Sequence, residues 1–168
     1  MAVTPLPLKL QALTAEAFAP FGDVIDTGGR QAEGINYGHT LKFADLALAD
    51  TADGGGKTVL HIYRSRPVSL PLKIEIMERH ALGSQAFMPL HPRPFIVVVA
   101  PAGDAPLAEQ VTAFITNGQQ GVNYHKGTWH HYQITLDEPG DYLVIDRAGP
   151  GENLEEHRLP RALVIETS

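Results

Sequence analysis

Glycine and proline punctuate this chain from end to end, and their distribution restricts its fold more than any other feature. The 16 glycines and 13 prolines are spread over 168 residues instead of being gathered into a linker. They separate many short runs that are rich in β-branched and aromatic residues. Short strand-like runs divided by turn residues are typical of a β-sandwich or a β-barrel.

The runs with the composition or alternation of a β-strand cover most of the chain after residue 57. They are residues 58–64, 73–80, 87–90, 95–100, 110–115, 128–136, 141–146 and 162–167. Near the start, Thr14 can cap a short helix over 15–19, and 45–49 is either a second short helix or a turn. The sequence therefore predicts a mainly-β fold, an antiparallel closed or double-sheet structure with one or two short helices near the N-terminus.

Composition excludes several classes of protein. With 43% apolar and 19% charged residues, the chain can bury a core and does not resemble a disordered segment. A net charge of −6 without a basic block argues against nucleic acid or an anionic membrane as a partner. The absence of cysteine excludes thiol catalysis, disulfides and cysteine-based metal sites. We expect no signal peptide, and the longest apolar run, 95–100, is too short to span a bilayer. We expect a cytoplasmic protein with one domain over residues 1–168.

Residues 73–80 alternate so that Ile74, Ile76, Glu78 and His80 share one face of a strand. The two isoleucines predict that this face is interior, and the carboxylate and imidazole that follow can converge on one point. A buried carboxylate is costly unless it is paired, hydrogen-bonded or bound to a metal. The face is either an ion pair that closes one end of the barrel or a functional pocket, and we favour the pocket.

A second polar cluster, residues 123–132, holds three of the eight histidines. The alternation that follows it predicts that His130 faces the core and that His131 points outward or toward a partner subunit. His125 lies in a turn and is interpreted as a rim residue, and the adjacent Lys126 as an anion-binding residue. Each of these two is equally well explained as an ordinary surface residue.

The spacing of these residues suggests a metal site. Many cupins bind a divalent ion through His-x-His, three or four residues and Glu, with a further His from a Pro-x-Gly-x-x-His turn. The corresponding positions here read Glu78-x-His80, four residues and Gln85, then His125-x-Gly127-x-x-His130. A metal would therefore depend mainly on Glu78, His80 and His130, with Gln85 as a possible further ligand. One carboxylate and two imidazoles can hold Ni, Mn, Fe or Zn.

At these residues the chain resembles the ureidoglycolate lyase family, formerly called ureidoglycolate hydrolase. The resemblance covers nearly the whole chain and is carried by residues 18–25, 78–89, 114–118, 121–131 and 146–147. It implies a cupin-like antiparallel β-barrel of the jelly-roll type, commonly a homodimer. It also implies cleavage of (S)-ureidoglycolate to glyoxylate and urea in allantoin (purine) breakdown. The resemblance further implies a divalent metal, nickel in particular, and no organic cofactor.

The reaction suits the polar residues. Ureidoglycolate carries a carboxylate, a hydroxyl and a ureido nitrogen on one carbon, so cleavage needs a base for the hydroxyl proton and an acid for the departing nitrogen. Glu78, His80 and His130 are the predicted catalytic residues, without a choice of which is base and which is acid. The predicted substrate-binding residues are Lys126 and Arg64 for the carboxylate, Gln85 and Asn123 for the ureido group, and His125 at the rim.

The same residues are compatible with two other functions. A hydrolase would attack the ureido carbonyl of the same substrate and release ammonia and carbon dioxide. A cupin-like module would bind a small carboxylate without converting it.

Overall fold

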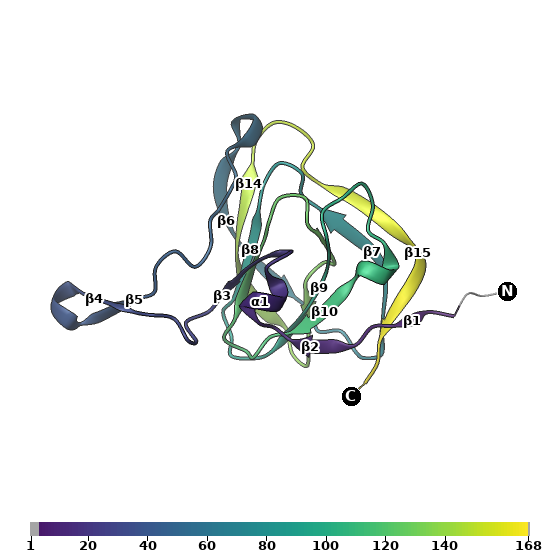
Figure 1. The fold of residues 1–168 in the computed structure, drawn as a ribbon, viewed down its shortest axis with the longest axis horizontal. Helices are drawn as coiled ribbons and strands as arrows, with labels where there is room; N and C mark the ends of the chain where they lie inside the picture. Colours follow the sequence, from purple (N-terminus) through teal and green to yellow (C-terminus); the bar gives the residue numbers. More distant parts are fainter. Residues whose placement is uncertain (1–3, 168) are drawn as a thin grey trace.

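Two β-sheets and a projecting arm make up the molecule, which is described by a computed structural model over residues 4–167 (Figure 1). The larger sheet has the strand order β1-β15-β7-β12-β9-β10-β2, with β13 beside β9, and the smaller has the order β3-β11-β8-β14-β6. The strands of the larger sheet are β1 (Leu6–Pro7), β2 (Leu10–Ala12), β7 (Leu72–Arg79), β9 (Phe95–Ala100), β10 (Thr112–Ile115), β12 (Trp129–His130), β13 (Ile134–Thr135) and β15 (Glu155–Ile165). Those of the smaller sheet are β3 (Gly22–Ile25), β6 (Lys57–Ser65), β8 (Gln85–Pro89), β11 (Gly121–Tyr124) and β14 (Gly140–Ala148).

The predicted mainly-β, barrel-like fold class is confirmed. Neighbouring strands are antiparallel except for β1 with β15 and β2 with β10, which are parallel. Among residues 4–167 the one α-helix is α1 (Ala15–Phe18), and Thr14 caps it by accepting a hydrogen bond from the backbone N–H of Ala17. Residues 45–49 are irregular and not helical. The described residues also form three single-turn 3₁₀ helices, η1 (Asn36–Gly38), η2 (Asp53–Gly55) and η3 (Ala108–Gln110). Within residues 4–167 no helix has the length and apolar character needed to cross a membrane.

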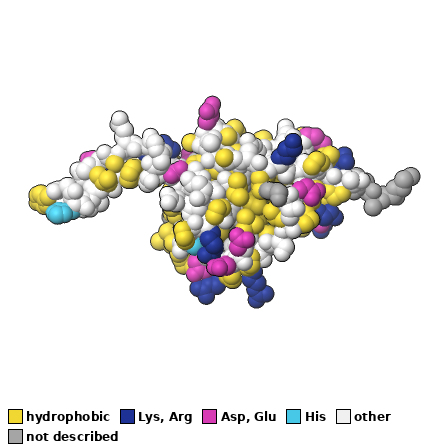
Figure 2. Space-filling view, turned by 90° about the horizontal axis from the view of Figure 1, so that it is seen from below, with side chains coloured by type: hydrophobic (Ala, Val, Ile, Leu, Met, Phe, Trp, Pro, Cys, Tyr) yellow, Lys and Arg dark blue, Asp and Glu magenta, His cyan; other side chains and the backbone are white. Residues whose placement is uncertain are grey.

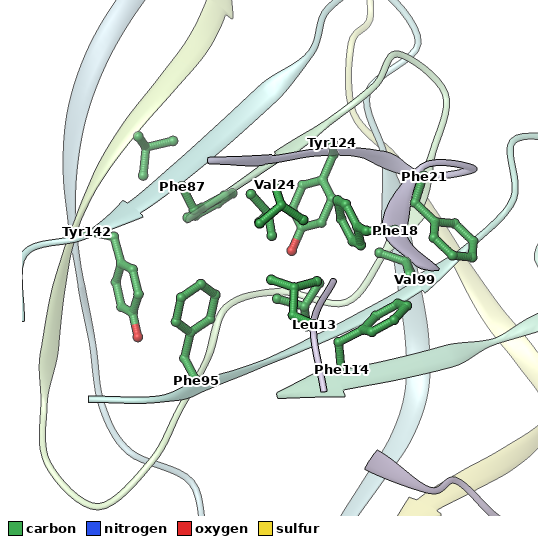
Figure 3. Close-up of a cluster of buried hydrophobic side chains, with 13 residues drawn as sticks. Leu13, Phe18, Phe21, Val24, Phe87, Phe95, Val99, Phe114, Tyr124 and Tyr142 are labelled. Atoms are coloured by element: carbon green, nitrogen blue, oxygen red, sulfur yellow. The ribbon is translucent and has the colours of Figure 1, made fainter. Parts of the chain in front are cut away.

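An aromatic core fills the space between the two sheets (Figure 3). The smaller sheet contributes Phe87, Val122, Tyr124, Tyr142 and Val144 to it, and the larger sheet contributes Phe95, Val97, Val99 and Phe114. Val24 of β3 is a further residue from the smaller sheet, and Leu13, Phe18 and Phe21 close the core from the N-terminal segment. The alternate residues of β9 pack on the opposite side of the larger sheet, in a second core that includes Trp129 and Ile134. Because β9 is buried on both faces, its sequence is a continuous apolar run instead of an alternating one.

The prediction that Ile74 shares the face of Glu78 is wrong, and so is the prediction that Ile76 is interior. Ile74 and Met77 both pack in the second core, although they are an odd number of residues apart, and Ile76 is half-exposed. The break in alternation coincides with a bulge in β15, where Arg158 pairs with Ile76 but Leu163 pairs with Ile74. A bulge of this kind changes the local twist and the direction of the side chains beside it. After Met77 the alternation resumes, and Glu78 and His80 face the space between the sheets.

The predicted strand over 128–136 is two short strands, β12 and β13, which both pair with β9. Between them Tyr132 is exposed, whereas His131 is buried with its Nδ1 atom 3.0 Å from the carbonyl oxygen of Tyr132. The prediction that His131 points outward is therefore wrong. Strict alternation fails here because the chain leaves the sheet after His130 and re-enters it four residues later.

An arm formed by β4 (Glu33–Ile35), η1 and β5 (Thr40–Lys42) extends from the body between β3 and β6, to the left in Figure 1. The two strands pair only with each other. Tyr37 at the turn is fully exposed, and Leu41 is 66% exposed. The space-filling view shows the arm standing clear of the body, with hydrophobic side chains at its end (Figure 2).

Candidate functional site

Two neighbouring strands of the larger sheet bring a carboxylate and two imidazoles together. His130 on β12 pairs directly with Glu78 on β7, and His80 follows two residues later on the same face. His130 Nδ1 lies 3.8 Å from Glu78 Oε1, and the two imidazole ring centroids are 5.3 Å apart. One possible ligand atom from each of the three residues lies within 4.8 Å of the others. The three residues therefore form one site.

The hydrogen bonds of both histidines leave the same atom free. His80 Nδ1 is 3.1 Å from the carbonyl oxygen of Asn153, and His130 Nδ1 is 3.2 Å from that of His131. A carbonyl oxygen only accepts, so each Nδ1 carries the proton and each Nε2 has an available lone pair. Both Nε2 atoms are buried without a hydrogen-bond partner among the described residues. Metal-binding histidines are commonly oriented by such a carbonyl contact, so the donor set fits a divalent metal.

Burial sets the charges in this site. It lowers the pKa of His130 to about 3, with a further contribution from the neighbouring His80, so His130 is neutral at physiological pH. Burial also raises the pKa of Glu78; His80 opposes this shift, and the carboxylates of Glu156 and Asp146 add to it. The ring of Tyr124 stacks on the His130 ring at a centroid distance of 4.3 Å and an angle of 3°, which holds the imidazole in place.

A cavity of about 400 Å³ opens beside Glu78 and His80, large enough for a small substrate. It is lined by Tyr63, Ser65, Glu78, His80, Gln85, Phe87, Tyr132, Gln133, Asp146 and Leu154. No lysine or arginine of the described chain lines it. Sequence reasoning missed Tyr63, Gln133 and Asp146. The side chain of the adjacent Arg147 does not pair with Asp146, because its guanidinium donates to the carbonyl oxygens of Asp53 and Pro150.

The structure does not bring Asn123, His125 or Lys126 to this cavity. Val122 and Tyr124 of β11 face the core, so Asn123 lies on the opposite face of the smaller sheet, where its amide donates to Asp23. His125 also contacts Asp23, and Lys126 is paired with Asp50 and Asp53 at 2.9 and 2.7 Å. His125 and Lys126 line a separate, acidic cavity of about 710 Å³ beneath the base of the arm.

Arg64 is also placed away from Glu78 and His80. Its neighbours on β6, Tyr63 and Ser65, line the cavity, so the Arg64 side chain lies on the other face of the strand. There it makes two hydrogen bonds of 2.8 Å with the carboxylate of Asp141. Of the predicted substrate-binding residues, only Gln85 lies in the cavity with the predicted catalytic residues.

Comparison with known proteins agrees with the resemblance carried by the sequence motifs. The family model described as "Ureidoglycolate lyase" matches residues 5–166. A protein of Burkholderia mallei (strain NCTC 10229) named ureidoglycolate lyase is 53% identical over 156 residues, covering 93% of this chain and 91% of the relative. A protein of the same name from Pseudomonas entomophila (strain L48) is 50% identical over 94% of this chain and 95% of its own length. A third, from Pseudomonas aeruginosa (strain UCBPP-PA14), is 51% identical over 89% of each chain. The chain is therefore an enzyme that belongs to the ureidoglycolate lyase family.

Proposed function

We propose that this enzyme cleaves (S)-ureidoglycolate to glyoxylate and urea, as a step of allantoin (purine) breakdown. The names of its relatives support this substrate. The observation that carries the proposal is the group formed by Glu78, His80 and His130. Glu78 and His80 line a cavity of about 400 Å³, and both histidines have a buried Nε2 atom without a partner in the described chain. A purely structural barrel would gain nothing from leaving these polar atoms unpaired, because each costs roughly 1–3 kcal/mol.

We also propose that Glu78, His80 and His130 hold a divalent metal, with nickel favoured by the family resemblance. When bound, such an ion polarises a substrate oxygen and offsets negative charge. Charge balance supports this role. Glu78 and Asp146 both line the cavity, no lysine or arginine of residues 4–167 does, and the substrate adds a third carboxylate.

The residues of the chain then have to move only one proton. In the elimination the O–H and C–N bonds of the substrate break, a C=O bond forms, and the proton ends on the departing urea nitrogen. One group that accepts this proton and returns it is sufficient. Glu78 suits that role because it lines the cavity and burial raises its pKa. An oxygen of its carboxylate that does not bind the proposed metal would accept the proton. His130 does not suit the acid role, because burial keeps its ring neutral.

Product analysis tests the proposed function. The purified enzyme is expected to release one intact urea and one glyoxylate from (S)-ureidoglycolate and to leave the other enantiomer unchanged. Activity should fall after a chelator removes bound metal and return when nickel is restored, with metal content measured in parallel. Ammonia and carbon dioxide as first products would establish the hydrolase instead, and binding without turnover would establish a binding module.

We propose that the active form is a homodimer that covers the outer face of the smaller sheet. Across β6 and β14, Leu60 pairs with Ile145 and Ile62 with Leu143, so their side chains share the face opposite the core. The side chains of Leu60 and Ile62, which are neighbours on one face of β6, are 66% and 57% exposed. Such exposure is unusual for two neighbouring apolar side chains. The arm projects from the same side of the molecule and carries the fully exposed Tyr37 (Figures 1 and 2). A second copy, related by two-fold symmetry, would bury both patches at once.

Replacing Ile62 by glutamate is expected to dissociate this dimer. A charge at a buried apolar contact is costly, whereas at an exposed position it is tolerated. Light scattering should give twice the chain mass of 18.2 kDa for the wild type and 18.2 kDa for the variant. The matched control is Leu107→Glu, at a position that is 51% exposed and lies before η3. A monomeric wild type, or an Ile62→Glu variant that stays dimeric, would refute this interface.

A further inference from the structure

The catalytic cavity contains a second polar group that the proposed proton transfer does not use. Gln85, the first residue of β8, is buried, and its amide Nε2 donates to Asp146 Oδ2 at 3.1 Å. Ala86 pairs with Ile145 in the adjacent strand β14, so the sheet register places Gln85 beside Asp146. The other oxygen of Asp146 accepts from the backbone N–H of Arg147 at 2.7 Å. The carboxylate of Asp146 is thus held in position from both of its oxygens.

This contact determines which end of the Gln85 amide faces the cavity. An ionised carboxylate accepts hydrogen bonds and cannot donate, so only the NH₂ end of the amide can face Asp146. The carbonyl oxygen, Gln85 Oε1, is then left as a free acceptor, and it is buried without a partner among the described residues. The same cavity contains a free donor, since Gln133 Nε2 is also buried without a partner in the described chain.

The free atoms have the polarity that a ureido group requires. A ureido group presents N–H donors and one carbonyl acceptor, so it can donate to Gln85 Oε1 and accept from Gln133 Nε2. Buried polar atoms without partners favour a ligand that supplies those partners. A cavity with these atoms discriminates against analogues in which the terminal nitrogen cannot donate.

We propose that Asp146 is a positioning residue for substrate selection: it fixes the Gln85 amide so that the enzyme recognises the terminal N–H groups of a monosubstituted urea. This inference rests on the proposed function, because it concerns the same cavity and the same substrate. Asp146 acts on the substrate through Gln85 and exchanges no proton itself, although its carboxylate also adds to the negative charge beside Glu78.

Asp146→Asn tests the proposal. An asparagine amide can donate to Gln85 Oε1, so the Gln85 amide could flip and exchange the positions of its oxygen and its NH₂ group. We expect KM for ureidoglycolate to rise about tenfold, the effect of one hydrogen bond of about 1.4 kcal/mol, while kcat changes less than about threefold. The wild type should prefer ureidoglycolate about tenfold over its terminally N,N-dimethylated analogue, and the variant should largely lose that preference. Gln85→Met, which keeps the chain length and removes the acceptor, should reproduce both effects even if Asp146→Asn folds poorly.

The matched control is Asp141→Asn, which removes an exposed carboxylate from the same strand β14 and should leave both parameters unchanged. The proposal is overturned if Asp146→Asn or Gln85→Met keeps the wild-type KM and discrimination. A fall in kcat alone, at unchanged KM, would likewise overturn it and move Asp146 into the chemical step. Failure of the proposed function is distinguishable, since in that case the wild type itself would form no urea and glyoxylate.

Discussion

Replacing His130 by asparagine is expected to lower the turnover of ureidoglycolate at least about 100-fold. Asparagine cannot replace both ring nitrogens of His130, of which Nδ1 lies 3.8 Å from Glu78 Oε1 and Nε2 is buried without a partner among the described residues. The expected loss in turnover combines two effects. The variant would bind the proposed metal more weakly, and the geometry around Glu78 would be less suited to proton transfer. Steady-state kinetics and metal content of the purified variant measure both.

Folding has to be checked separately, because His130 is buried and stacked on Tyr124. His80→Asn gives an independent measurement, since His80 is less buried and supplies the other free Nε2 atom. His157→Asn is the matched control: this histidine packs against Trp129, which belongs to the second core, and should not alter turnover. A folded His130→Asn variant with turnover within tenfold of the wild type would remove His130 from the mechanism.

Replacing Phe114 by alanine is expected to lower the free energy of unfolding by about 3–5 kcal/mol. Phe114 is fully buried and makes edge-to-face contacts with Phe18 at 5.6 Å and with Phe21 at 6.2 Å (Figure 3). Through these contacts α1 and the start of β3 are attached to the larger sheet. Truncation removes apolar contact area and leaves a cavity that the rigid strands cannot fill. Urea-induced unfolding, followed by fluorescence, measures the loss.

Two further variants separate packing from other effects of the substitution. Phe114→Leu keeps much of the volume and should cost clearly less than alanine. Leu107→Ala truncates a side chain that is 51% exposed and should change the free energy of unfolding by no more than about 0.5 kcal/mol. A loss below about 1 kcal/mol for Phe114→Ala would contradict the assignment of this residue to the central core.

Much of the fold could be predicted from local sequence. The continuous apolar run 95–100 became β9 with the same bounds, because a strand buried on both faces needs no polar positions. The Thr14 cap was equally local, since the hydroxyl and the N–H that it satisfies are three residues apart. The strands of the first 45 residues and β11 were missed. β1 to β5 and β11 are each two to four residues long, too short to show a period.

The grouping of Glu78, His80 and His130 could also be anticipated, from the i, i+2 geometry of a strand and the spacing of the two motifs. The inward face of β7 could not be anticipated, because Ile74 and Met77 both pack in the second core although strict alternation would put them on opposite faces. Alternation shows only that adjacent side chains point in opposite directions. Which of those directions is the interior depends on the sheet that packs against the strand.

The sequence by itself therefore determined the strand-rich architecture, the family and the three residues at the centre of the site. Only the tertiary structure decided the surroundings of that site. In the folded chain Lys126 forms ion pairs with Asp50 and Asp53, and Arg64 forms one with Asp141. Asp146 accepts a hydrogen bond from Gln85. The physical reason is that a charged or amide side chain takes the partner that the fold places within hydrogen-bond distance. In these pairs the partners lie about 60 to 77 residues apart in sequence.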